Sequence, residues 1–400
     1  MALPVLLLVA LCLAVRVAPA LYFGAEEADL TVYHRMANIV LRGENIYFQR
    51  VLYPYTPVSM YVPALCLLLA QWLHLPFHFV MKWPAIGADM AIVALLYAIA
   101  RQVSGRTGAA AGVALLYALN PVAILISAMH GNITPVAVAL GLAAYGVALC
   151  RRREEDLWYC ALLLGLAIGF RSYPVLWLPF FLIKLPMTWR QRAVFTALAA
   201  LPSLVTLLPF LVASFRDVWR EAFGYSGFAD HGWVAILRDA NLLLPANAHR
   251  YDVKALLQVS KKLFLAAYAL LVVAVALRPR RISLAGGLTV SMLLFYTVYG
   301  GVASQYLQWV LPFGLLSSVP LALAFTPVAT AALVSFYAMY FPGILWGTRQ
   351  PLLLPQPRDG VVFYLVALVQ CWLLCCLWLG WELIAPSGQS RRASPSVELL

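Results

Sequence analysis

The stretch Phe23–Pro57, FGAEEADLTVYHRMANIVLRGENIYFQRVLYPYTP, decides how the remaining sequence is interpreted, because it is a polar segment between apolar ones. It opens with three acids within four residues, Glu26, Glu27 and Asp29. A helical pattern follows, and Gly43 is expected to end it. The apolar face of this pattern consists of Leu30, Tyr33, Met36, Ala37, Val40 and Leu41. Such a wide face is typical of a helix lying on a membrane surface.

An aromatic, proline-bearing segment follows that helix. It contains Tyr47-Phe48 and then Tyr53-Pro54-Tyr55-Thr56-Pro57. Amphipathic rings settle at the headgroup level of a bilayer. Acids beside aromatic rings at the mouth of a membrane domain predict a catalytic site.

The composition predicts a polytopic helical membrane protein. The 400 residues are 64% hydrophobic and 11% charged, whereas a soluble domain is about 25% charged. Apolar runs of about twenty residues recur along the chain. The net charge of +12 comes from short basic clusters, which argues against a nucleic-acid partner. The seven cysteines lie in or beside apolar segments and indicate neither a metal site nor a disulfide framework.

Charge in the short connectors predicts the orientation of the chain. The basic connectors, expected in the cytoplasm, are Arg101–Arg106, Arg151–Arg153, Lys184–Arg192, Arg278–Arg281 and the tail with Arg391 and Arg392. The connectors expected outside contain a single Arg and no Lys, and they are Met129–Pro135, Gly169–Pro174 and Ser304–Trp309.

This alternation predicts a bundle of about 12 transmembrane helices with two long extracytoplasmic loops, residues 23–83 and 214–258. The expected spans lie near residues 3–22, 84–101, 109–127, 133–150, 157–170, 172–186, 192–213, 259–277, 283–303, 305–325, 326–346 and 361–384. Residues 58–75 are then a re-entrant or interfacial hairpin. Residues 1–384 form one integral membrane domain, and residues 385–400 a disordered cytoplasmic tail.

Two charged residues lie within the expected spans. Ala18-Pro19-Ala20 resembles a signal-peptide cleavage site, but Arg16 interrupts the apolar run and no basic n-region precedes it, so a retained first helix is favoured. Arg16 is expected either to reach the interface or to face the bundle. Asp89 is expected to pair within the bundle and brace the fold.

Each candidate site residue has a structural alternative. Asp29 is the favoured general base, with Glu26 and Glu27 as alternates, although Asp also serves well as a helix N-cap. His130 lies in a turn, His130-Gly131-Asn132, and is either a ligand contact or part of a tight turn. Arg171 is expected to meet either an anionic ligand or a loop acid.

The order of these features resembles the GT-C superfamily of polytopic glycosyltransferases. Within it the chain is most similar to the bacterial family-87 polyprenyl-phosphate mannosyltransferase-like proteins, and more distantly to the catalytic subunit of GPI mannosyltransferase I. The resemblance is carried by Asp29-x-x-x-Tyr33, Gly43-x-x-x-Tyr47, Tyr53-Pro54-Tyr55-Thr56-Pro57, Asp89, Asn120-Pro121, His130-Gly131-Asn132, Phe170–Pro174, Pro179 and Gln305-Tyr306-x-x-Trp309-x-x-Pro312.

The sequence departs from this family at two places. Ile133-Thr134-Pro135 stands where members often have an acid a few residues after the His-Gly-Asn position. The first-loop acids read Glu26-Glu27-x-Asp29 and not Asp-x-Asp, so the choice of base stays open among the three.

The resemblance implies an inverting hexosyltransferase, expected to use mannose, with a polyprenyl-phosphate-linked donor and a lipid- or glycan-linked acceptor. It implies membrane lipid as a partner and no required cofactor; a divalent metal is compatible with it but not indicated. It also implies a site facing outward from a bacterial plasma membrane, or alternatively from the endoplasmic reticulum membrane. The expected substrate-binding residues are Tyr33, Tyr53, Tyr55, Lys82, His130, Asn132, Arg171, His249, Arg250, Gln305 and Tyr306.

A flippase or transporter of lipid-linked sugars is the alternative function. It is expected to show inverted repeats and a site at the membrane midplane. The sequence shows no internal repeat, and its polar residues map to one face. A third hypothesis, a non-catalytic assembly partner, leaves the acid cluster unexplained.

Overall fold

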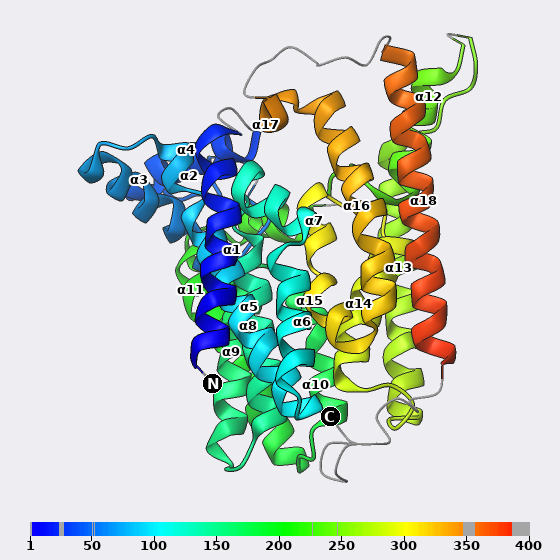
Figure 1. The fold of residues 1–400 in the computed structure, drawn as a ribbon. Helices are drawn as coiled ribbons and strands as arrows, with labels where there is room; N and C mark the ends of the chain where they lie inside the picture. Colours follow the sequence, from blue (N-terminus) through cyan, green and yellow to red (C-terminus); the bar gives the residue numbers. More distant parts are fainter. Residues whose placement is uncertain are drawn as a thin grey trace. The chain divides into compact units, whose positions relative to one another are not determined.

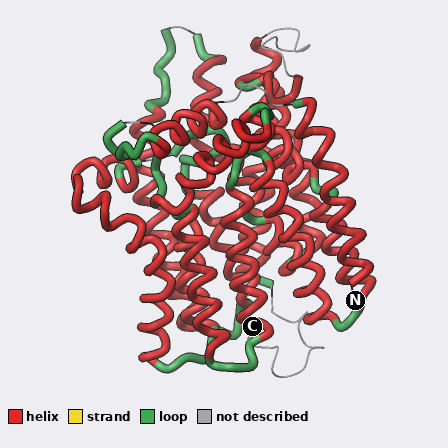
Figure 2. The backbone as a smooth tube through the Cα atoms, turned by 90° about the vertical axis from the view of Figure 1, so that its left-hand side faces the viewer, coloured by secondary structure: helices red, strands yellow, loops and turns green. Residues whose placement is uncertain are grey.

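The computed structural model describes residues 2–23, 28–49, 51, 53–225, 227–245, 247–346 and 357–385. Helices account for all the regular structure in these ranges (Figure 2), and the β-type pairing there is an isolated bridge between His231 and Val302. The prediction of an all-helical chain is confirmed.

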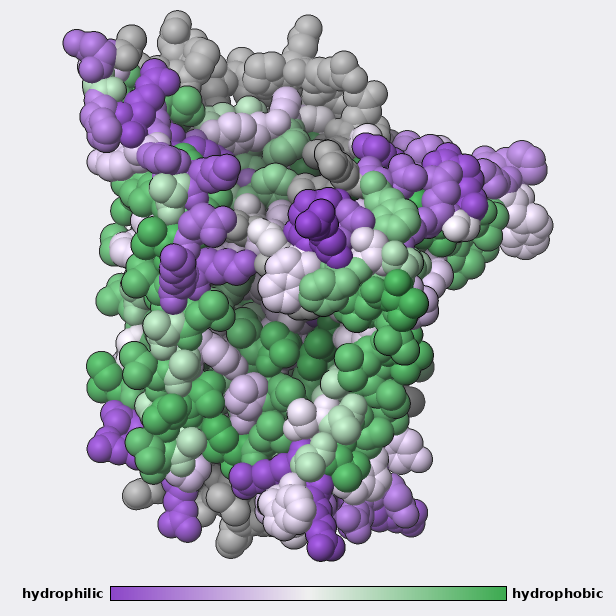
Figure 3. Space-filling model, turned by 180° about the vertical axis from the view of Figure 1, so that it is seen from behind, coloured by the Kyte–Doolittle hydropathy of each residue, from purple (hydrophilic) through white to green (hydrophobic). Residues whose placement is uncertain are grey.

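Six of the described helices are long and apolar enough to cross a membrane. They cover Leu3–Tyr22, Phe77–Ser104, Trp189–Ala222, Val253–Leu277, Val319–Tyr340 and Asp359–Ile384. A seventh candidate is a broken span, Thr107–Ala118 with Pro121–His130, bent by 45°. Shorter apolar helices lie between them, and hydrophobic side chains cover much of the exposed helix surface in Figure 3. The chain is an integral membrane protein. The spans expected near residues 172–186 and 283–303 are shorter helices than predicted, Tyr173–Lys184 and Leu284–Val298.

The chain divides into two compact units. The first contains Met1–Leu119, Ala123–Leu178 and Leu185–Tyr225, and the second contains Asn120–Val122, Pro179–Lys184 and Ser226–Leu400. The helices of the first unit (Figure 1) are α1 (Ala2–Tyr22), α2 (Ala28–Leu41), α3 (Tyr61–Leu73), α4 (Phe77–Val80), α5 (Trp83–Ser104), α6 (Thr107–Ala118), α8 (Thr134–Cys150), α9 (Glu155–Phe170) and α11 (Trp189–Val218), and α7 (Pro121–Ile124) straddles the division.

Close helix packing forms the core of the first unit. Helix α5 packs against α1, α6 and α8, and α9 packs against α8 and α11. Gly165 lies where α9 meets α11, and a Cβ there would be 2.6 Å from the Ala199 carbonyl oxygen. Glycine at this position therefore lets the two backbones approach closely.

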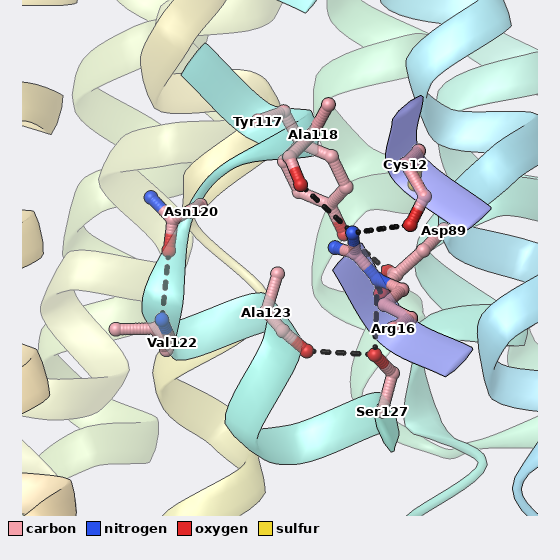
Figure 4. Close-up of polar contacts among 9 residues, drawn as sticks. All are labelled: Cys12, Arg16, Asp89, Tyr117, Ala118, Asn120, Val122, Ala123 and Ser127. Atoms are coloured by element: carbon pink, nitrogen blue, oxygen red, sulfur yellow. Dashed lines mark hydrogen bonds and ion pairs between the residues drawn. The ribbon is translucent and has the colours of Figure 1, made fainter. Parts of the chain in front are cut away.

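A buried ion pair ties α1 to this core. The Arg16 Nε donates to Asp89 Oδ2 at 2.8 Å, the Tyr117 hydroxyl donates to Asp89 Oδ1 at 2.7 Å, and the Arg16 Nη1 donates to the Ala118 carbonyl at 2.8 Å (Figure 4). The side chains of Arg16 and Asp89 are both fully buried. Asp89 thus braces the bundle as predicted, and Arg16 faces the bundle.

The predicted surface helix is α2. Its residues Leu30, Tyr33, Met36 and Ala37 are buried. Leu41, assigned to the same face, is 43% exposed, because the helix ends there and Gly43 turns the chain with φ +69°. Helix α3 packs against α2 and has 13 residues. It is roughly 20 Å long, as are other short apolar helices of the chain, and the non-crossing hairpin at residues 58–75 stays a prediction.

The second unit consists of α10 (Leu178–Lys184, from Pro179 on), α12 (Gly232–Leu243), α13 (Val253–Leu277), α14 (Leu284–Val298), α15 (Leu311–Ser317), α16 (Val319–Tyr340), α17 (Pro342–Trp346) and α18 (Pro357–Ile384). Helix α18 packs against α12, α14 and α16. The predicted division into spans 305–325 and 326–346 is wrong. The chain breaks at Ser318, whose backbone is extended, and Pro327 lies inside α16, since an apolar helix tolerates an internal proline when neighbours satisfy the freed carbonyl.

One loop predicted from the sequence has more helical structure than expected, and one predicted break is present. The predicted loop 214–258 begins inside α11, which is kinked at Ser214 and reaches Val218, and it holds the whole of α12. The break predicted at Arg171 is present, because α9 ends at Phe170 and Arg171 is extended.

Candidate functional site

A short loop in the first unit, residues 130–133, positions the residues of the candidate site. It follows a π-helical turn, Leu125–His130, that ends at Gly131 with φ +79°. A Cβ at Gly131 would lie 3.0 Å from the Lys82 Cγ, so both the backbone conformation and the space favour glycine. This turn brings the side chains of His130 and Asn132 to the same carboxylate.

That carboxylate belongs to Asp29, in the first turn of α2. The His130 Nε2 lies 2.9 Å from Asp29 Oδ2, and the Asn132 Nδ2 donates to the same oxygen at 2.7 Å. The orientation of the Asn132 amide is fixed, because its Oδ1 accepts the backbone N–H of Thr134 at 2.9 Å. Neither donor binds Asp29 Oδ1, which has no hydrogen-bond partner among the residues that the structure describes. The Asp29 side chain is 34% exposed.

The surroundings keep Asp29 ionised. Burial raises the pKa of its carboxyl, but the hydrogen bond and charge of His130, the hydrogen bond of Asn132 and the charge of Arg171 together hold the pKa below its ordinary value of 3.8. Asp29 is therefore a carboxylate at neutral pH, anchored through one oxygen and open at the other.

Arg171 lies beside this carboxylate, just after α9, and is 2% exposed. Its Nη2 donates to the Tyr33 hydroxyl at 3.0 Å, and its guanidinium lies over the Tyr55 ring at 4.0 Å from the ring centroid. The Nε of Arg171 is buried and has no hydrogen-bond partner within the described ranges. No carboxylate of the described residues forms an ion pair with Arg171 within 4.0 Å, so the predicted alternative of a loop-acid partner is not observed there.

The aromatic segment holds Tyr55 over Arg171. The Tyr47 hydroxyl donates to the Tyr55 carbonyl at 2.7 Å, and the Tyr53 hydroxyl donates to the Thr56 carbonyl at 2.7 Å. The Thr56 hydroxyl in turn donates to the Gly169 carbonyl at the end of α9. The hydroxyls of Tyr47, Tyr53 and Thr56 therefore fix the segment, and the Tyr55 ring is the part that meets the site.

The structure thus brings together six of the residues predicted from the sequence: Asp29, Tyr33, Tyr55, His130, Asn132 and Arg171. Lys82 lies next to the site loop, because its Cγ would be 3.0 Å from a Cβ at Gly131, and its role as a substrate contact stays a prediction. Its Nζ donates to the backbone carbonyls of Ala20 and Phe23 at the end of α1, where a cation complements the helix dipole.

Four predicted residues belong to the second unit. His249 and Arg250 are exposed there, whereas Gln305 and Tyr306 are buried, with the Tyr306 ring stacked on Trp309 at 3.9 Å between centroids. Glu26 and Glu27 lie outside the described residues.

One contact of the site has no signal in the sequence. The backbone N–H of Ile133 lies close enough to the Tyr33 hydroxyl to lower the pKa of the phenol. Loop 130–133 therefore contacts α2 at two positions one turn apart, Asp29 and Tyr33. Among the described residues no group of three His, Cys, Asp or Glu side chains is arranged to hold a metal ion.

Comparison with known proteins identifies the fold. No family model matches the chain, and no curated protein matches it. Solved structures that match include ArnT from Cupriavidus metallidurans bound to undecaprenyl phosphate, with 15% identity, and the same protein in the apo state, with 16% identity, both with a TM-score of 0.52. Each match covers 95% of this chain and 77% of the ArnT chain. The likeness confirms the predicted GT-C-like fold.

Proposed function

We propose that this chain, which has the fold of ArnT, is an inverting glycosyltransferase that takes its sugar from a polyprenyl-phosphate-linked donor. The observation that carries the proposal is the carboxylate of Asp29, bound by two donors at Oδ2 and open at Oδ1, beside the buried guanidinium of Arg171. A base and a cation side by side match the two requirements of the reaction, acceptor deprotonation and stabilisation of the departing phosphate.

In the proposed reaction the acceptor hydroxyl attacks the anomeric carbon from the face opposite the phosphate. The new C–O bond forms as the bond from carbon to phosphate oxygen breaks, and the polyprenyl phosphate leaves with the electron pair. The hydroxyl proton passes to Asp29 Oδ1. A carboxylate of low pKa suffices as the base, because the hydroxyl becomes strongly acidic once its oxygen bonds to carbon.

Arg171 is proposed to bind the phosphate of the donor. Its guanidinium presents a buried Nε–H that has no hydrogen-bond partner among the described residues. Stacking on the Tyr55 ring fixes the plane of the guanidinium. Arginine suits this role because its planar donors match the phosphate geometry and its charge is permanent. ArnT, the structural neighbour, was solved with undecaprenyl phosphate bound.

The finer assignments rest on the family resemblance. It favours a hexose, with mannose first, a glycolipid or glycan acceptor, a site facing outward from a bacterial plasma membrane, and donor contacts by His249, Arg250, Gln305 and Tyr306. The two long loops, residues 23–83 and 214–258, are proposed to exclude water, because hydrolysis of the donor competes with transfer.

Transfer of radiolabel by the purified protein in detergent tests the function. Donors are polyprenyl-phosphate-linked mannose, glucose and aminoarabinose, with a membrane lipid extract as acceptor, with and without EDTA. Label in a new glycolipid or glycan supports the proposal. A flippase instead moves the intact donor across sealed vesicles with no new product, and that outcome contradicts the proposal.

A further inference from the structure

The hydroxyl of Tyr33 accepts a hydrogen bond from Arg171 and still has its own proton to donate. The Arg171 Nη2 donates to it at 3.0 Å, and the backbone N–H of Ile133 lies close enough to lower the pKa of the phenol. A phenol oxygen has two lone pairs and one proton. With one lone pair engaged by Arg171, the proton of Tyr33 remains for donation to a further partner.

The proton of Tyr33 has no acceptor among the described residues. The side chain is 5% exposed, and burial raises the pKa of the phenol, so the proton stays on the oxygen at neutral pH. A buried hydroxyl without an acceptor costs free energy. The neighbouring cation makes this O–H a stronger donor, since it draws electron density from the phenol oxygen.

A second unsatisfied donor lies on the same edge of the guanidinium. In arginine, Nε–H and one Nη2–H point in parallel along one edge, which is the edge that grips a carboxylate or a phosphate in bidentate pairs. Arg171 donates to Tyr33 through Nη2, and its buried Nε–H has no partner in the described part of the chain. A ligand oxygen bound by Nε therefore lies near the Tyr33 hydroxyl.

From this geometry we infer that the Tyr33 O–H and the Arg171 Nε–H together bind the phosphate of a polyprenyl phosphate, with Tyr33 donating to an anionic oxygen. Tyr33 and Asp29 lie one turn apart on α2. Helix α2 therefore presents both the hydroxyl that donates a hydrogen bond to the phosphate and the carboxylate that acts as the base. Loop 130–133 lies against both. The inference rests on the proposed donor class and adds the atom of Tyr33 that recognises it.

Equilibrium binding of undecaprenyl phosphate to the full-length protein in detergent tests the inference, with undecaprenol as the ligand that lacks phosphate. Tyr33→Phe removes one charge-assisted hydrogen bond, worth about 1.5–3 kcal/mol, so Kd is expected to rise by about tenfold or more. Tyr97→Phe is the matched control, because the Tyr97 hydroxyl is buried without a partner among the described residues of the same unit. It should bind like the wild type.

A fluorinated tyrosine separates donation to the ligand from a merely structural role. Tyr33→3,5-difluorotyrosine makes the O–H a stronger donor and its oxygen a weaker acceptor. Tighter binding of undecaprenyl phosphate than in the wild type supports donation to phosphate. Unchanged or weaker binding by this variant, or wild-type affinity in Tyr33→Phe, overturns the inference.

Two further binding measurements identify which phosphate-bearing molecule occupies the site. Phosphatidylglycerol, a bilayer phospholipid, should fail to displace undecaprenyl phosphate at equal concentration, and displacement overturns the polyprenyl assignment. Failure of the wild type to bind undecaprenyl phosphate at all contradicts the proposed donor class itself. By contrast, wild-type binding with no effect at Tyr33 leaves that function standing and refutes only the role of Tyr33.

Discussion

The substitution Asp29→Asn separates a catalytic role from a structural one. The Oδ2 position of Asp29 receives two donors, from His130 and Asn132. The new amide must therefore place its oxygen there and its NH2 group at the Oδ1 position. The acceptor hydroxyl then faces an N–H group in place of a basic oxygen, so no group is left there to accept its proton.

The expected effects of Asp29→Asn on the transfer rate and on stability differ enough to separate the catalytic role from the structural one. Loss of a general base costs about 10²–10⁴-fold in rate, which is roughly 3–5 kcal/mol of barrier. The two hydrogen bonds persist but lose their charge assistance, about 1 kcal/mol each, and the 34% exposure of the side chain reduces that further. We expect a folded protein that binds the donor, melts within a few degrees of the wild type and does not transfer sugar.

The assay measures initial rates of transfer, binding of undecaprenyl phosphate and thermal unfolding on the same preparations. Glu26→Gln and Glu27→Gln are run beside Asp29→Asn, because these acids were alternates for the base in the sequence. More than a tenth of the wild-type rate in Asp29→Asn, together with an inactive Gln variant, refutes the assignment. A fall in activity that only tracks the loss of folded protein refutes it as well.

Three other outcomes are expected. Asn132→Ala removes a donor that lowers the pKa of Asp29; because the ionised form is the base, the acid limb of kcat/KM should move to higher pH, and an unmoved limb would show that Asn132 only shapes the turn. Arg171→Lys loses the Nε–H and the stacking on Tyr55, so the KM for the donor should rise by about tenfold at nearly constant melting temperature, whereas loss of folded protein would make it a structural residue. Asp89→Asn leaves the buried cation of Arg16 uncompensated and should cost about 3–5 kcal/mol, seen as a lower unfolding temperature that Arg16→Met partly restores; an unchanged temperature would contradict the bracing role.

Local sequence patterns predicted the helices near the site. The period of α2, its end at Gly43 and the break at Arg171 follow from short-range rules on apolar spacing and glycine. The break between α15 and α16 did not follow. It occurs at Ser318 and not beside Pro327, because packing against neighbouring helices overrides the local effect of a proline inside an apolar bundle.

The contacts within the site were beyond sequence reasoning. His130 and Asn132 were predicted to bind substrate, and the structure shows them bound to Asp29, about a hundred residues earlier in the chain. Lys82 donates to a carbonyl at the end of α1, a contact that its charge and its place in the sequence did not indicate. Residue type and spacing indicate that a polar group needs a partner, whereas only the fold determines which partner it meets.

The most direct test of the central claim is a single-turnover measurement with polyprenyl-phosphate [¹⁴C]mannose, and with the other sugars in parallel, on wild-type protein and Asp29→Asn. The account predicts that label leaves the polyprenyl phosphate and appears with inverted anomeric configuration in an acceptor. It also predicts that the variant does this at least a hundredfold more slowly. Label that stays on the polyprenyl phosphate with every sugar, or equal transfer by both proteins, would contradict it.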